Sequence, residues 1–81
     1  MRRFYFHIRS GDELLRDDQG QDFPDISTAR CEAEKSAREI VAAAIRSGRE
    51  QIPEAFVIAD ELGATIDTFP FAVVLPKPLK K

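Results

Sequence analysis

The chain has 81 residues, of which 43% are hydrophobic, and a formal net charge of −2. A chain of this length forms one small domain with a thin core, since it buries only about 60 to 65% of the surface that its unfolded form exposes. The near-neutral charge disfavours a general binder of nucleic-acid backbones, which requires a contiguous basic surface. The single cysteine excludes an internal disulfide and any multi-cysteine metal site.

The sequence contains no segment typical of secretion or membrane insertion. The apolar stretch after Met1 is far shorter than the core of a signal peptide, and no run approaches the ~20 apolar residues of a membrane span. We therefore expect a cytoplasmic protein without membrane contact. We expect one domain over residues 1–75 and a flexible basic tail over residues 76–81.

Residues 3–9 alternate strictly between apolar and polar side chains, which predicts a half-buried strand. The alternation places Phe4, Phe6 and Ile8 on one face and Arg3, Tyr5, His7 and Arg9 on the other. This polar face is the one candidate binding site, because aromatic rings stack on bases and arginines hold phosphates. The alternative is a sheet face covered by solvent or by a second copy. We predict no catalytic residue, since the sequence places no nucleophile beside the histidine.

Turn residues separate two further short strands from the first. Ser10-Gly11-Asp12 predicts a turn, after which Leu14-Leu15 can pair back as a second strand. Asp17-Asp18-Gln19-Gly20 predicts another turn, and a third short strand is expected over residues 21–23.

One long amphipathic helix is predicted between Phe23 and Gly48. Asp25 or Ser27 is expected to cap its first amides, and Gly48 to end it in a left-handed conformation. At 100° per residue Cys31 points outward. The predicted buried face consists of small and branched residues: Ile26, Ala29, Ala33, Ser36, Ala37, Ile40 and Ala44.

A strand over residues 55–59, a turn over residues 60–63 and a returning strand over residues 64–69 complete the chain. The two acidic turns share a D-[DE]-x-G form, in which the aspartate caps the turn and the glycine takes a positive φ. The expected fold class is α+β: a small antiparallel sheet, in the order β-β-(β)-α-β-β, with one long amphipathic helix packed on one face.

The acidic residues after Leu15 do not have the spacing of a calcium-binding loop. They lack the alternating ligands and the closing glutamate of an EF-hand, so we expect them to cap turns and the helix. We predict no metal site and no cofactor. The residues concerned are Asp17, Asp18, Asp22 and Asp25.

Several short sequence words resemble a family of short bacterial domains of unknown function that has a Tyr-Phe-His opening and a Pro-Phe ending. The resemblance covers residues 3 to about 75 and implies no activity. A looser resemblance is to the N-terminal domain of HicB-type antitoxins, although the Gly-Cys word common there is missing. The words are Tyr5-Phe6-His7-Ile8-Arg9, Asp17-x-x-Gly20, Phe23-Pro24-Asp25, Ala29-x-x-Glu32-Ala33, Asp60-x-x-Gly63 and Phe69-Pro70-Phe71.

These features favour a non-catalytic interaction or regulatory domain, in one form antitoxin-like, over an enzyme. The alternative is a domain that binds single-stranded nucleic acid through the polar strand face. We expect a homodimer or another protein partner, because the apolar bulk exceeds what a one-sided core of this length is expected to enclose. That bulk comes from Phe56, Val57, Ile58, Phe69 and Phe71.

Overall fold

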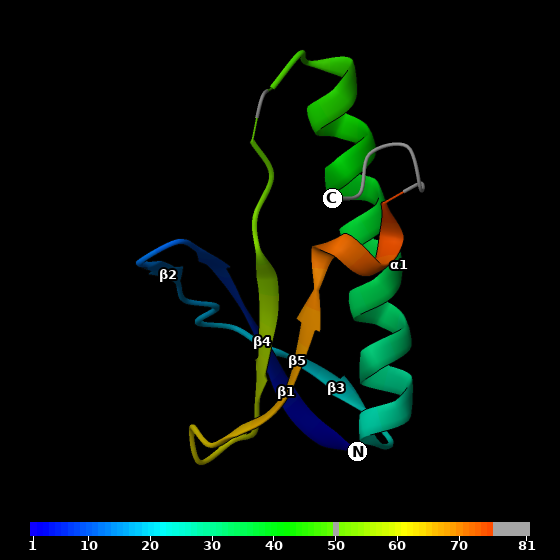
Figure 1. The fold of residues 1–81 in the computed structure, drawn as a ribbon. Helices are drawn as coiled ribbons and strands as arrows, with labels where there is room; N and C mark the ends of the chain where they lie inside the picture. The colour runs from blue at the N-terminus through cyan, green and yellow to red at the C-terminus, as the bar shows by residue number, and fades with distance from the viewer. Residues whose placement is uncertain (50, 76–81) are drawn as a thin grey trace.

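A computed structural model describes residues 1–49 and 51–75, and it confirms the α+β class (Figure 1). The basic tail predicted over residues 76–81 lies outside the described residues. Within the described ranges, no helix has the length and the apolar character needed to cross a membrane. The elements in chain order are β1 (Arg2–Ser10), β2 (Glu13–Leu15), β3 (Gln21–Phe23), α1 (Ile26–Arg46), β4 (Ala55–Ala59), β5 (Thr65–Pro70) and the short 3₁₀ helix η1 (Phe71–Val74).

The five strands form one antiparallel sheet in the order β2-β1-β4-β5, with β3 also paired to β1. One edge of β1 pairs with β4 over residues 5–9. The other edge is shared, because β3 takes residues 2–4 and β2 takes residues 8–10. Between these two partners, the middle of β1 pairs with no strand on that side. The backbone groups of this segment need other hydrogen-bond partners. The side chain that partners one of them belongs to the candidate site described below.

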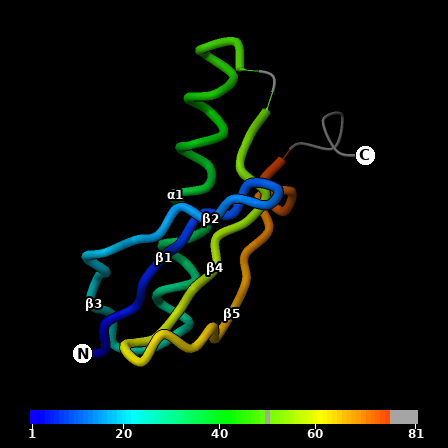
Figure 2. The backbone as a smooth tube through the Cα atoms, turned by 90° about the vertical axis from the view of Figure 1, so that its left-hand side faces the viewer, coloured from blue at the N-terminus to red at the C-terminus, as the bar shows by residue number. Residues whose placement is uncertain are grey.

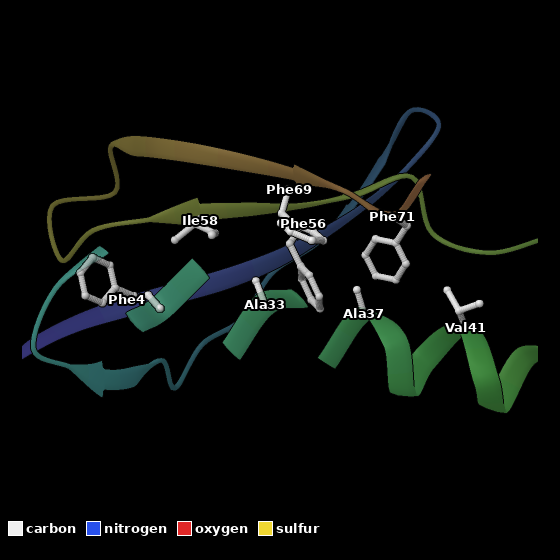
Figure 3. Packing of buried hydrophobic residues seen from close by; sticks show 9 residues of the cluster. Phe4, Ala33, Ala37, Val41, Phe56, Ile58, Phe69 and Phe71 are labelled. Carbon is white, nitrogen blue, oxygen red and sulfur yellow. The ribbon is translucent and has the colours of Figure 1, made fainter. Parts of the chain in front are cut away.

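Helix α1 packs along one face of the sheet through a row of small residues (Figures 1 and 3). Alanines let the helix axis approach the sheet closely, and the space between them is filled by rings such as Phe56 and Phe71, whose centroids lie 5.0 Å apart. The helix wheel predicted most of this face but omitted Val41, which is 5% exposed. The buried helix residues are Ala29, Ala33, Ala37, Val41 and Ala44.

Both ends of α1 have the predicted chemistry. Asp25 is the N-cap, and its Oδ1 accepts a hydrogen bond of 2.8 Å from the backbone N–H of Thr28. The helix stops before Gly48, whose φ is +72°. Cys31 is exposed, as the wheel predicted. Ala42 lies opposite Ala33 on the same wheel, which predicts exposure, but it is half-buried.

The prediction that the apolar bulk exceeds the capacity of one chain is wrong. All of strand β4 is buried within the monomer, and Phe69 and Phe71 are 2% and 0% exposed. On the helix face, α1 packs against β3, β5 and η1. On the opposite face Val57 lies between its cross-strand neighbours His7 and Thr68. A charge at Val57 would therefore destabilise the monomer and cannot serve as a specific probe of association.

Candidate functional site

A cavity of about 230 Å³ lies beside the middle of β1 and joins two segments that are distant in the sequence. Tyr5 and His7 of β1 form one wall. The second wall is residues 16–18, and the third is the end of β4 with the turn that follows it. The two D-[DE]-x-G turns of the sequence therefore flank one cavity. Figure 2 shows the neighbouring courses of β1, β4 and the β4–β5 turn.

Asp17 occupies the unpaired edge of β1 and replaces the missing strand. Its Oδ2 accepts a hydrogen bond of 3.1 Å from the backbone N–H of Phe6. Its Oδ1 accepts hydrogen bonds, each of 3.1 Å, from the backbone N–H groups of Gln19 and Gly20. One carboxylate therefore caps its own turn and also satisfies a part-buried amide of the central strand.

These contacts also determine the ionisation of Asp17. Partial burial acts to raise the pKa of this carboxyl group, but the hydrogen bonds from the amides of Phe6, Gly20 and Gln19, together with attraction to His7, outweigh it and lower the pKa below its ordinary value of 3.8. Asp17 is therefore a carboxylate at neutral pH.

His7 is the one buried polar residue among those that the structure describes, with 9% exposure. The backbone N–H of Asp17 donates a hydrogen bond of 3.0 Å to His7 Nδ1. Nδ1 therefore carries the lone pair, and in the neutral ring Nε2 carries the proton. The ring of Tyr5 stacks on the imidazole, with centroids 6.5 Å apart and an interplanar angle of 21°. His7 thus presents an N–H donor, rather than a basic nitrogen, to any ligand in the cavity.

Gly20 of the first turn lies close to β1. Its φ is +70°, and a Cβ at this position would lie 2.9 Å from Arg3 Cγ and 2.9 Å from Tyr5 Cε2. The corresponding Gly63 of the second turn has a φ of +87°, but a Cβ there would meet nothing within 4 Å. The first turn therefore requires glycine both for its positive φ and because a side chain would clash with β1. The second turn requires glycine only for its positive φ.

The second acidic turn is capped by Asp60 in the way that the sequence predicted. Its Oδ1 accepts hydrogen bonds from the backbone N–H groups of Leu62, at 2.9 Å, and Ala64, at 3.0 Å. Unlike Asp17, Asp60 makes no side-chain hydrogen bond to a strand among the described residues. The shared sequence form thus specifies the turn but does not distinguish the residue that also binds β1.

The structure brings together two of the four residues of the predicted polar face. Tyr5 and His7 line the cavity, whereas Arg3 and Arg9 do not. Arg3 Nε pairs with Asp22 Oδ1 at 3.1 Å, and Arg3 Nη1 donates to the Gln19 carbonyl at 2.6 Å. Arg9 Nε lies 3.7 Å from the Glu54 carboxylate. Both arginines therefore form ion pairs within the chain, and the Nε of Arg9 makes no hydrogen bond to the described residues.

The electrostatic character of the cavity is acidic. Four carboxyl groups line it against one arginine, namely Asp17, Asp18, Asp60 and Glu61 against Arg16. No group of three His, Cys, Asp or Glu side chains in residues 1–49 and 51–75 has the arrangement of a metal site. The sequence did not predict this cavity, because its walls come from distant segments that only the pairing of strands in the sheet brings together. The repeated D-[DE]-x-G form was the available signal.

The fold and its cavity define a small α+β domain, whose described residues form one α-helix, a short 3₁₀ helix and a five-stranded antiparallel sheet. The chain belongs to the family described as Domain of unknown function (DUF6894), whose model matches residues 3–72. No curated protein and no solved structure matches the chain.

Proposed function

We propose that this chain is a non-catalytic protein-interaction domain and that its first partner is a second copy of itself. The observation that carries the proposal is an apolar groove of about 420 Å³ between the β1–β2 hairpin and the C-terminal half of α1. Ile8 and Leu15 form one apolar wall, and Ile40 and Pro53 form the other. Helix α1 extends beyond the strands at this end of the molecule (Figure 1).

The hairpin beside the groove exposes large apolar side chains. Leu15 of β2, which lines the groove, is 68% exposed, whereas Leu14, on the opposite face of the strand, is 42% exposed and does not line it. Strand β2 is also an edge strand with free backbone groups. Apolar side chains that surround a groove are typical of a surface that is covered by a partner.

The charges at the rim favour a second copy as the occupant. Glu13 lies on the hairpin side of the groove, and Arg49 lies on the side that follows α1. A two-fold axis brings the same patch of each subunit together, so the acid of one copy can face the base of the other. A patch that carries both charges on opposite rims is therefore complementary to itself. In this arrangement Leu15 of each copy enters the groove of the other.

The cavity beside His7 supports an interaction role over nucleic-acid binding and over catalysis. Its acidic lining repels phosphates, and the two arginines of the polar strand face are paired with Asp22 and Glu54. The hydrogen bond from Asp17 to Nδ1 leaves His7 without a basic nitrogen toward the cavity. An antitoxin-like role is one form of the proposed function. Co-purification with the product of an adjacent toxin gene would support it.

Analytical ultracentrifugation of the wild type, Leu15→Glu and Leu62→Glu tests the proposal. Leu62 is 92% exposed at the β4–β5 turn, so its substitution introduces the same charge away from the groove. The wild type and Leu62→Glu are expected to sediment at twice the 9.1 kDa monomer mass, and Leu15→Glu as a monomer. A monomeric wild type at micromolar concentration, or equal dimerisation of both variants, would refute the groove as the interface.

Exchanging the charges of Glu13 and Arg49 tests the rim of the groove separately. Glu13→Arg should weaken the dimer through repulsion from Arg49, and adding Arg49→Glu should restore it. Failure of the double variant to recover dimerisation would mean that these charges do not face each other.

A further inference from the structure

We infer that His7 and the first acidic turn form a pH-sensitive switch, in which protonation of the imidazole releases residues 17–20 from the edge of β1. Two hydrogen bonds hold this turn to the strand. The backbone N–H of Phe6 donates to Asp17 Oδ2 at 3.1 Å, and the backbone N–H of Asp17 donates to His7 Nδ1 at 3.0 Å. The proposed dimer groove is lined by other residues, so the inference is independent of self-association.

The N–H of Asp17 determines which nitrogen of His7 takes up a second proton. Because Nδ1 accepts this hydrogen bond, the neutral ring carries its proton on Nε2. An imidazolium carries a proton on both nitrogens and has no lone pair, so no rotation of the ring restores an acceptor. Charging His7 places the new proton on Nδ1, 3.0 Å from the nitrogen of Asp17. The hydrogen bond and the charge on His7 therefore exclude each other.

Burial makes the loss of this hydrogen bond costly while the turn stays in place. His7 is 9% exposed, stacks on the ring of Tyr5 and is the cross-strand neighbour of Val57 in β4. The bond from Asp17 is part-buried, and its N–H has no other acceptor among residues 1–49 and 51–75. Two donors that face each other without water are unfavourable, whereas movement of the turn away from β1 hydrates both. Protonation therefore favours displacement of the turn.

The charges that surround His7 lower the cost of charging the ring, and burial raises it. Carboxylates outnumber arginines in the cavity, Arg3 and Arg9 of the same strand are ion-paired, and β4 contributes only apolar side chains. These effects oppose each other, so we place the test between about pH 5 and 8, where histidine side chains change charge. The titratable or charged residues that line the cavity with His7 are Tyr5 of β1, Arg16, Asp17 and Asp18 at the first turn, and Asp60 and Glu61 of the second turn.

The carboxylate of Asp17 stays ionised throughout this pH range. Partial burial acts to raise its pKa, but the hydrogen bonds from backbone amides outweigh burial and hold the pKa below the ordinary value of 3.8. Acidification from pH 8 to 5 therefore leaves the acceptor of the Phe6 N–H unchanged and removes only the acceptor at His7. The released form binds one proton more than the docked form, so docking of the turn weakens as the pH falls.

An NMR titration of the ¹⁵N-labelled full chain from pH 8 to pH 5 tests the switch. The imidazole ¹⁵N shifts report the tautomer and the titration of His7, which is the only histidine of the chain. Hydrogen exchange at the Asp17 amide, divided by the intrinsic rate at each pH, reports the docking of the turn. We expect no proton on Nδ1 at pH 8. As the imidazole titrates, protection of the Asp17 amide should fall at least about tenfold, because a part-buried donor loses its acceptor.

The second acidic turn and one variant provide the controls. The N–H of Leu62 donates to Asp60 Oδ1 at 2.9 Å, a bond of the same kind that contains no histidine, so its protection should stay constant. His7→Asn replaces the imidazole by an amide whose oxygen can accept the Asp17 N–H but does not titrate. The loss of Asp17 protection between pH 8 and pH 5 should therefore disappear in this variant.

Several results would overturn the inference. In the wild type these are a proton on Nδ1 at pH 8, an imidazole that stays neutral down to pH 5, or an Asp17 amide that keeps its protection while the imidazole titrates. In His7→Asn the contrary result is the same loss of protection as in the wild type. If this variant does not fold, the wild type decides alone, because the imidazole and the Asp17 amide must then share one midpoint, and different midpoints would reject the switch.

Discussion

Replacing Asp17 by alanine should destabilise the domain more than replacing Asp60, although both aspartates cap turns of the same form. Each substitution removes two hydrogen bonds to turn amides, a loss of about 1 kcal/mol by analogy with helix caps. Asp17→Ala also leaves the part-buried N–H of Phe6 without its acceptor at 3.1 Å. That unsatisfied donor costs about 1 to 3 kcal/mol. We therefore expect a loss of about 2 to 4 kcal/mol for Asp17→Ala against about 1 kcal/mol for Asp60→Ala.

Thermal unfolding followed by circular dichroism measures this difference. A loss of 1 kcal/mol lowers the Tm of a domain of this size by about 4 to 8 °C, so the two variants should be separated by at least one such step. Urea titrations with equal m-values would show that the difference lies in stability and not in the compactness of the unfolded chain. Equal losses for both variants would refute the role of Asp17 as the substitute partner of β1.

The dependence of stability on pH provides a second test of the Asp17 carboxylate. The pKa of Asp17 is lower in the folded chain than its ordinary value of 3.8, so its contribution to stability is complete above that value and is lost as the pH falls through the lower, folded pKa. The stability gap between the wild type and Asp17→Ala should therefore close at pH values below 3.8. A gap that remains constant in acid would mean that the ionised carboxylate contributes nothing.

Three further outcomes follow from positions with matched controls. Gly20→Ala should cost about 2 to 4 kcal/mol, because it adds a steric clash with β1 to the strain of a left-handed backbone. Gly63→Ala incurs only that strain, about 1 to 2 kcal/mol. Equal melting temperatures for the two variants would contradict the close approach of Gly20 to β1. Ala33→Leu should overpack the helix–sheet contact by about 1 to 3 kcal/mol, whereas Ala43→Leu on the exposed side should be nearly neutral; an unchanged Tm for both would reject this helix orientation. Cys31 should react with a thiol reagent in the native state at nearly the unfolded rate, and strong protection would indicate that a partner covers it.

Local patterns predicted most of the fold. The alternation of Phe4, Phe6 and Ile8 predicted the central strand, and the spacing of alanines predicted the helix face, because both periods reflect which side chains a single element turns toward a core. The D-[DE]-x-G form predicted both turns for a similar reason, since an aspartate cap acts within four residues.

The candidate site depended on contacts that no local pattern encodes. Asp17 Oδ2 binds an amide 11 residues upstream, and only the division of one edge of β1 between two short strands creates that vacancy. His7 was expected on an open polar face, but the turn bound by Asp17 closes over it. Alternation specifies the face on which a side chain lies, whereas the burial of that face depends on the rest of the fold.

In the proposed dimer, Leu15 of each copy lies in the groove of the other. An isotope-filtered NOESY spectrum of a mixture of ¹³C-labelled and unlabelled protein observes only contacts between copies. We predict intermolecular NOEs between the methyl groups of Leu15 in one copy and those of Ile40 in the other. A dimer that shows no such NOE, or NOEs only at other surfaces, would contradict pairing through this groove.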